Sequence, residues 1–237
     1  MKSIVYKLLC ILLCFSLLFM LSGCEILISD NDKDDGKDDG KDNDKDDDKD
    51  DGKDNDKDDD ESSFVPEDGR CYVVFTVKNF GKITVELLPE YAPITVEHFI
   101  EVVNSGFYSG TTFHRILSDF MIQGGAPKSD SPSISPIVGE FASNGYTENT
   151  LSHERGVISM ARTSAPNSAT TQFFICNADY PSLDGQYAAF GRVVDGMDVV
   201  DAITEHGMKY TSYYENGMIY DESKQPVIKS AVIIDNR

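Results

Sequence analysis

Three short blocks in the chain contain the residues whose types and spacing could do chemistry. They are 113–125 (FHRILSDFMIQGG), 159–175 (SMARTSAPNSATTQFFI) and 183–191 (LDGQYAAFG). Each block combines aromatic and aliphatic residues with a few polar ones, among them Arg115, Gln123 and Gln172. Arginine stays charged at every working pH, and its planar fork donates several hydrogen bonds. The blocks therefore combine aromatic side chains with a permanent hydrogen-bond donor.

Other common kinds of active site are poorly supported. Ser159 and His153 could suggest a hydrolase, but the sequence around them shows neither a nucleophile elbow nor an evident partner carboxylate. The cysteines form no CxxC pair and no zinc-ligand cluster. We therefore expect neither a metal nor a cofactor.

Strands dominate the elements that must position these blocks. Segment 71–77 is rich in β-branched and aromatic residues, and 82–88 alternates apolar and polar residues with a period of two. Residues 79–81 between them suit a hairpin turn. Further short strands are expected at 111–116, 120–124, 157–162, 172–177, 188–194 and 227–234. Many short strands with few helices predict an all-β fold, a closed β-barrel.

Two helices complete the predicted domain. Pro93 suits the first turn of a helix, and Val96, Phe99, Ile100 and Val103 then fall on one face. Gly106 should end this helix. A second, shorter helix fits 197–203.

Together the three blocks resemble the signature segments of the cyclophilins, in that family's order and at about its spacing. The resemblance extends over roughly residues 70–235. It implies a closed eight-stranded antiparallel β-barrel capped by two α-helices, with a peptide groove on its outside. It also implies peptidyl-prolyl cis-trans isomerase activity on Xaa-Pro bonds, without a cofactor. Proline-containing polypeptides are then the partners, and we expect a monomer.

The resemblance also assigns site residues. Arg115 matches the catalytic arginine. The substrate-binding positions implied are Phe120, Met121, Phe174 and Leu183 for the proline pocket, Gln123, Ala161 and Arg162 for the peptide backbone, and Gln172 and Tyr187 along the groove. Tyr187 replaces the family's usual histidine, and Ser182 stands where many cyclophilins have the tryptophan associated with cyclosporin binding. Weak drug affinity is therefore expected.

Isomerisation needs no nucleophile, because no bond is broken. Amide resonance imposes a rotation barrier of about 18–20 kcal/mol. The proline nitrogen regains its lone pair only when the amide is twisted, and a guanidinium can then donate to it. This is stronger binding of the transition state than of the ground state. The alternative is a proline-peptide-binding chaperone module whose isomerase activity is incidental. The presence of Arg115 favours the enzyme.

The N-terminus reads as an export signal. Lys2 and Lys7 precede an apolar run, 8–21, that is too short for the roughly 20 residues of a membrane-spanning helix. It ends in Leu-Ser-Gly before Cys24, which resembles a bacterial lipobox. We therefore expect a signal peptide at 1–23, lipidation of Cys24, a tether over 24–63 and an isomerase domain at 64–237. This predicts a lipid-anchored protein on the extracytoplasmic face of a bacterial membrane.

The tether is acidic and of low complexity. Residues 30–61 contain 18 Asp, one Glu and seven Lys, a net charge of −12, and no apolar residue. Such a segment cannot offset its ordering entropy and should be disordered. Its spacing fails the EF-hand pattern, although a surface module that binds cations or cell wall stays possible as a third hypothesis. The absence of a basic patch argues against nucleic acid.

The body of the protein keeps two cysteines, Cys71 and Cys176. In an oxidising compartment they could form a disulfide. Each also lies in a predicted buried strand, which favours two separate thiols. The separate thiols are the preferred interpretation.

Overall fold

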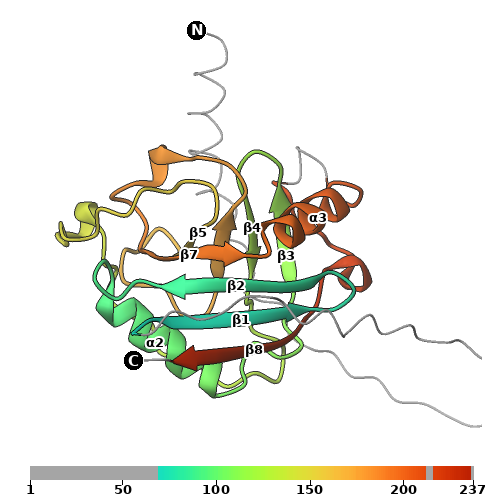
Figure 1. Cartoon of the computed structure of the whole chain (residues 1–237), viewed down its shortest axis with the longest axis horizontal. Helices are drawn as coiled ribbons and strands as arrows, with labels where there is room; N and C mark the ends of the chain where they lie inside the picture. Colours follow the sequence, from blue (N-terminus) through green and yellow to red (C-terminus); the bar gives the residue numbers. More distant parts are fainter. Residues whose placement is uncertain (1–68, 212–215, 236–237) are drawn as a thin grey trace, which may run out of the picture. The chain divides into compact units, whose positions relative to one another are not determined.

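The computed structural model describes residues 69–211 and 216–235. The predicted signal peptide 1–23, the lipidation site Cys24 and the predicted tether 24–63 lie outside the described residues. Within the described part, eight antiparallel strands form one sheet in the order β3-β4-β6-β5-β7-β2-β1-β8 (Figure 1). The strands are β1 Cys71–Val77, β2 Gly81–Leu87, β3 Phe113–Leu117, β4 Met121–Gly124, β5 Val157–Met160, β6 Phe173–Cys176, β7 Ala189–Asp195 and β8 Ile228–Asp235.

The sheet is an open half-barrel, so the predicted closed barrel was wrong. β3 and β8 end the strand order, and no ladder joins them among the described residues. Segment 216–228 instead lies along the β3 edge, where Ile116 N donates to Gly217 O over 2.7 Å. Alternating hydrophobicity shows which side chains face the core, but it does not show whether the first and last strands of a sheet meet. The closure could therefore not be judged from the pattern.

The concave side of the sheet holds the core. Ile116, Ile122, Ile175 and Ile158 are cross-strand neighbours on β3, β4, β6 and β5, and all four are fully buried. Large aromatic side chains fill the space beside them: Phe75, Phe99, Tyr108, Phe113, Phe173 and Phe190. They pack largely edge to face, as aromatic quadrupoles prefer. The opposite face of the same strands is therefore not needed for the core and can carry functional side chains.

A buried carboxylate fixes the start of the first helix, α2 (Pro93–Asn104). The residue before it, Ala92, has no side chain that could cap the helix. Glu140 takes that part, accepting hydrogen bonds from Ile94 N over 3.1 Å and from Thr95 N over 2.7 Å. A negative charge at this end also suits the helix dipole. The predicted apolar face of α2 is buried, apart from partly exposed Ile100.

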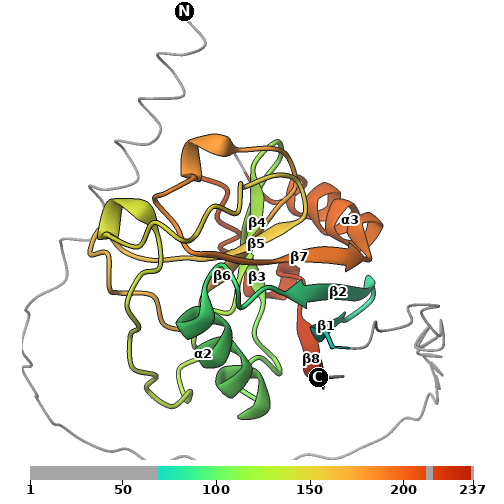
Figure 2. The same cartoon turned by 60° about the vertical axis from the view of Figure 1, so that its left-hand side comes forward.

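The second helix, α3 (Met197–Gly207), is one turn longer than predicted. Gly207 lets it lie close to β3, because a Cβ there would come within 2.6 Å of the Ile116 side chain. Figures 1 and 2 show α2 and α3 at different ends of the curved sheet. Among residues 69–211 and 216–235, no helix is long and apolar enough to cross a membrane.

Candidate functional site

The outer face of the half-barrel carries a row of candidate site residues. Arg115 on β3 pairs with Gln123 on β4, Gln123 pairs with Phe174 on β6, and Phe174 pairs with Ser159 on β5. Cross-strand partners share a face of the sheet. The row therefore lies on the face of the sheet opposite the buried isoleucines. Because successive side chains along a strand point to opposite faces, site residues and core residues alternate.

Polar contacts hold the Arg115 guanidinium from two sides. Its Nε donates to the carbonyl oxygen of Asn216 over 2.9 Å, and its Nη1 donates to Gln123 Oε1 over 3.1 Å. Gln123 in turn donates from Nε2 to Gln172 Oε1 over 3.0 Å. The structure thus brings together three residues that the sequence assigned to the site, and it directs a charged fork along the outer face.

An apolar cluster lies next to the arginine. Met121, Phe174 and Cys176 form its buried part, with 1%, 5% and 0% of their surfaces exposed. Leu117, Phe120, Ala161, Leu183 and Tyr187 pack around it and are partly exposed. Every residue predicted for the proline pocket is in this cluster. The partly exposed edge of the cluster is formed by apolar and aromatic side chains.

Arg162 closes one end of the cluster. Its guanidinium lies over the rings of Tyr187, at 4.6 Å, and Phe141, at 4.9 Å. It also donates from Nε and Nη2 to the carbonyl oxygen of Gln186 over 3.1 and 2.7 Å. The backbone N–H of the preceding residue, Ala161, donates to Gln172 O over 2.9 Å. Much of this guanidinium is therefore engaged within the protein.

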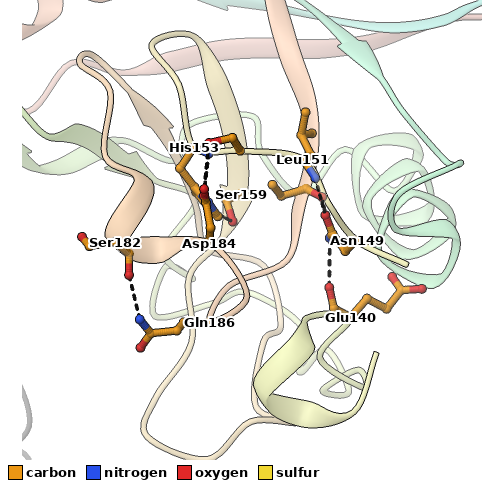
Figure 3. A network of polar contacts seen from close by, with 10 residues as sticks. Glu140, Asn149, Leu151, His153, Ser159, Ser182, Asp184 and Gln186 are labelled. Carbon is orange, nitrogen blue, oxygen red and sulfur yellow. Dashed lines mark hydrogen bonds and ion pairs between the residues drawn. The ribbon is translucent and has the colours of Figure 1, made fainter. Parts of the chain in front are cut away.

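Figure 3 shows a Ser–His–Asp arrangement in which Ser159 and His153 are buried, while 37% of the Asp184 side chain is exposed. The His153 ring stacks on Phe174 with ring centroids 6.0 Å apart. His153 Nδ1 lies 2.8 Å from Asp184 Oδ1, and its Nε2 lies 3.1 Å from Ser159 Oγ. Both contacts are satisfied by a neutral imidazole that donates to Asp184 and accepts from Ser159. The expectation that no carboxylate accompanies His153 and Ser159 was therefore wrong.

This arrangement is nevertheless unsuited to hydrolysis. Ser159 is completely buried and His153 is 1% exposed, so a substrate carbonyl cannot reach the hydroxyl. Burial lowers the pKa of His153 against the opposing effect of Asp184. Burial works to raise the pKa of Asp184, but hydrogen bonds from His153 and Ser152 outweigh it and lower that pKa. The network is better suited to a structural role, in which His153 packs against the Phe174 ring.

Sequence reasoning missed several residues that shape the site. His153 was given no role, and Tyr180, whose ring packs at a tilt against that of Phe120 with the centroids 4.4 Å apart, was not considered. Asp184 stood in the third block, where it could have been noticed as a carboxylate. Asn216 had no sequence signal, because it contributes a backbone carbonyl that any residue possesses. Among the described residues, no group of three or more His, Cys, Asp or Glu side chains could hold a metal.

An antiparallel half-barrel that carries a fixed arginine beside an apolar cluster is the arrangement of a cyclophilin-like peptide site. A family model described as "Cyclophilin type peptidyl-prolyl cis-trans isomerase/CLD" matches residues 72–230. Peptidyl-prolyl cis-trans isomerase A of Dickeya dadantii is 45% identical over 168 residues, which cover 68% of this chain and 84% of that protein. Peptidyl-prolyl cis-trans isomerase B of Escherichia coli is 38% identical over 166 residues, covering 66% and 95%.

Solved structures agree with the sequence relatives. A cyclophilin type peptidyl-prolyl cis-trans isomerase of Cryptosporidium parvum, crystallised in the presence of the dipeptide Ala-Pro, is 29% identical with a TM-score of 0.56, covering 70% of this chain and 99% of that one. Cyclophilin AquaCyp293 of Hirschia baltica is 27% identical with a TM-score of 0.56, covering 69% and 76%. The chain belongs to the cyclophilin family, and it is a peptidyl-prolyl cis-trans isomerase.

Proposed function

We propose that Arg115 catalyses isomerisation by donating a hydrogen bond to the proline nitrogen of a twisted Xaa-Pro amide. The observation that supports this role is the position of its guanidinium, which Gln123 and Asn216 hold beside the apolar cluster. A planar amide has no nitrogen lone pair to offer, so the hydrogen bond forms only near the transition state. Donors aimed at such a position lower the barrier because they need no reorganisation during the reaction.

The apolar cluster would bind the proline ring. Met121 and Phe174 form its base, while Phe120 and Leu183 offer partly exposed walls. Desolvation by this wall would strengthen the hydrogen bond from Arg115, since the local dielectric is lower than that of water. Gln123 and Gln172 would contact the peptide backbone. A proline-containing segment of an unfolded polypeptide is the substrate class that fits both parts.

The test is NMR exchange spectroscopy on an Xaa-Pro peptide with wild type, Arg115→Ala and, as a matched control, Arg155→Ala. Arg155 is an exposed arginine that pairs with Asp201 and is absent from the site. Arg115→Ala should lower kcat about a hundredfold or more with little change in KM, as expected for a lost transition-state donor. Equal kcat for wild type and Arg115→Ala would refute the proposed role. Peptide binding without isomerisation by wild type would instead favour the chaperone module.

We further propose that the enzyme acts on exported proteins near a bacterial membrane. Support comes from the sequence alone: the apolar run 8–21, the lipobox-like residues before Cys24 and the acidic tether at 30–61. Uncatalysed prolyl isomerisation takes tens of seconds or longer, which leaves an exported chain exposed while it folds. Cys24→Ala should release the protein from membranes. If the variant stays in the membrane fraction, the lipid anchor is refuted.

Deleting 30–61 while keeping Cys24 separates the two views of the tether. A simple spacer predicts unchanged activity on a free peptide and reduced activity on clients at the membrane. A cation- or wall-binding module predicts instead that the isolated segment binds Ca²⁺ or cell-wall material by itself. The net charge of −12 permits weak cation association, so the measurement must distinguish saturable from unsaturable binding.

A further inference from the structure

The turn at Asn216 and Gly217 makes contacts with both the backbone and the side chain of the catalytic strand. Asn216 lies 101 residues beyond Arg115, yet its carbonyl oxygen accepts the Nε hydrogen bond at 2.9 Å. The next carbonyl, of Gly217, accepts from Ile116 N over 2.7 Å, and Ile219 N donates to His114 O over 2.9 Å. A bridge between Arg115 and Met218 lies between these two bonds. The turn is thus fixed in register with β3.

The backbone of this turn has an unusual conformation. Asn216 has φ 53° and Gly217 has φ 76°, both in the left-handed region. Asparagine tolerates this region better than most residues, and glycine adopts it freely. A Cβ on Gly217 would also lie 2.5 Å from Ile116 O and 2.6 Å from Leu117 Cγ. The close approach of the turn to β3 therefore requires glycine at 217.

A glutamine braces the segment after the turn. Gln225 donates from Nε2 to Ile219 O over 2.7 Å, and its Oε1 accepts a hydrogen bond from Thr112 Oγ1. Thr112 directly precedes β3, so the brace connects the segment to the strand a second time. Ile219 is 1% exposed and packs in the core. The Asn216 carbonyl is therefore presented from an anchored segment.

We infer that the Asn216–Gly217 turn is a positioning element that sets the orientation of Arg115 for catalysis. This inference rests on the proposed role of Arg115. An arginine side chain carries about 2 kcal/mol of rotamer entropy, and a donor must be fixed in advance to stabilise a transition state. Gln123 restrains Nη1 from β4, and Asn216 restrains Nε from the opposite edge of β3. With both restraints, the guanidinium plane is directed along the apolar cluster.

The first test compares Gly217→Ala with Gly145→Ala. Gly145 also has a positive φ, of 90°, but a Cβ there would meet no atom within 4 Å. Both variants therefore carry similar backbone strain, and only Gly217→Ala pushes the turn away from β3. We expect kcat of Gly217→Ala to fall about tenfold to a hundredfold, since small misplacements of catalytic groups have such costs. The KM of Gly217→Ala should stay within about twofold of wild type, and so should the kcat of Gly145→Ala.

A double-mutant cycle separates positioning from general damage. If the turn acts through Arg115, Gly217→Ala should change kcat by less than about twofold in an Arg115→Ala background, because the side chain that it orients is gone. An undiminished loss in that background would overturn the inference. Gln225→Ala provides a second variant in case Gly217→Ala does not fold. It loosens the segment without a clash and should lower kcat in the same Arg115-dependent way.

The outcomes distinguish this inference from the proposal it rests on. If Arg115→Ala is as active as wild type, the proposed role of Arg115 fails and the inference fails with it. If Arg115→Ala loses activity while folded Gly217→Ala and Gln225→Ala keep wild-type kcat, only the positioning role of the turn is refuted.

Discussion

The two halves of the site are ordered by different physical means. The apolar cluster around Met121 and Phe174 is ordered by packing, and its base is almost completely buried. The Arg115 half is ordered by hydrogen bonds, from β4 on one side and from a distant turn on the other. Packing energy is shared with the fold, whereas partly exposed hydrogen bonds contribute only about 1 kcal/mol each. Substitutions in the apolar half should therefore affect stability more than catalysis, and substitutions in the Arg115 half should affect catalysis more than stability.

The same contrast should divide the work of the two halves between binding and reaction. In the proposed mechanism the apolar surface would contact the proline ring in the cis, trans and twisted states alike, so its main effect would be on KM, and it would add to kcat only by desolvating the hydrogen bond from Arg115. In the same mechanism the guanidinium hydrogen bond would form only with the twisted nitrogen, so it would raise kcat. The cluster and the arginine should therefore be separable in kinetics as well as in stability.

The largest combined effect is expected for Phe174→Ala. Truncating a buried phenylalanine typically costs about 3–5 kcal/mol of stability, and Phe174 is only 5% exposed. Removing the base of the pocket should also raise KM about tenfold or more, because a buried apolar side chain contributes about 1.5–3 kcal/mol. Urea unfolding and NMR exchange kinetics measure the two effects.

Arg115→Ala is the matched comparison for that experiment. It should cost about 1 kcal/mol of stability or less, while kcat falls and KM is nearly unchanged. If Phe174→Ala lowered kcat with KM constant, or if Arg115→Ala destabilised the fold as much as Phe174→Ala does, the division between the halves would be wrong.

A smaller effect is expected for Gln123→Leu, which removes one of the restraints on Arg115. Leucine keeps a similar volume in the row but cannot accept from Nη1 or donate to Gln172. Small misplacements of a catalytic group can lower the rate by up to about a hundredfold, so kcat should fall about tenfold to a hundredfold. The free energy of unfolding should stay within about 1 kcal/mol of wild type. A variant that binds peptide poorly but turns it over normally would show that Gln123 only contacts the peptide backbone and does not restrain Arg115 for catalysis.

The sequence predicted the apolar half of the site better than the polar half. The family resemblance assigned Met121 and Phe174 to the proline pocket, and both lie in the apolar cluster, on the strand face opposite Ile122 and Ile175. The helix start at Pro93 was also correct, although its buried cap, Glu140, was not foreseen. Tertiary partners of this kind have no local signal, because any distant carboxylate could supply the cap.

The polar half depends on backbone geometry that side-chain patterns do not encode. Segment 207–225 had no predicted role, yet it includes the turn that contacts Arg115. Segment 216–228 lies along the β3 edge. Its position there determines both that β3 forms an open edge of the half-barrel and that the Asn216 carbonyl reaches Arg115. Family likeness therefore pointed to Arg115 but not to the backbone carbonyl that accepts its hydrogen bond.

The two halves should also differ in their response to pH. Burial lowers the pKa of His153 below its usual 6.5, so the folded protein binds this proton less readily than the unfolded chain does. Stability supported by neutral His153 is thus complete above pH 6.5 and is lost as the pH falls from there toward the folded-state pKa. Burial lowers the pKa of His114 in the same direction. Asp184, with its lowered pKa, adds a further loss below its usual 3.8.

Urea unfolding at a series of pH values tests this response. Wild type should lose stability as the pH falls below about 6.5, and His153→Gln should show a shallower slope there because one of the two histidines whose pKa burial lowers is gone. The kcat of the folded enzyme should stay flat over the same range, since arginine does not titrate there. A kcat that fell with the protonation of a group near pH 6 would show that catalysis needs more than Arg115.

The smallest effect is expected at the two thiols, and it tests whether the apolar half stays closed. Cys176 belongs to the cluster base, and burial, together with the charges of Asp184 and Asp179, raises its pKa to about 12. At pH 8 only about one molecule in ten thousand would then carry the reactive thiolate. Cys71 and Cys176 are separate buried thiols on β1 and β6, as preferred from the sequence. Alkylation at these two positions, followed by peptide mass spectrometry, should therefore be negligible in the native protein and complete in urea. Rapid native labelling of Cys176 alone would mean that the cluster opens readily. The apolar half would then need a bound peptide to become ordered, just as Arg115 is inferred to need the turn.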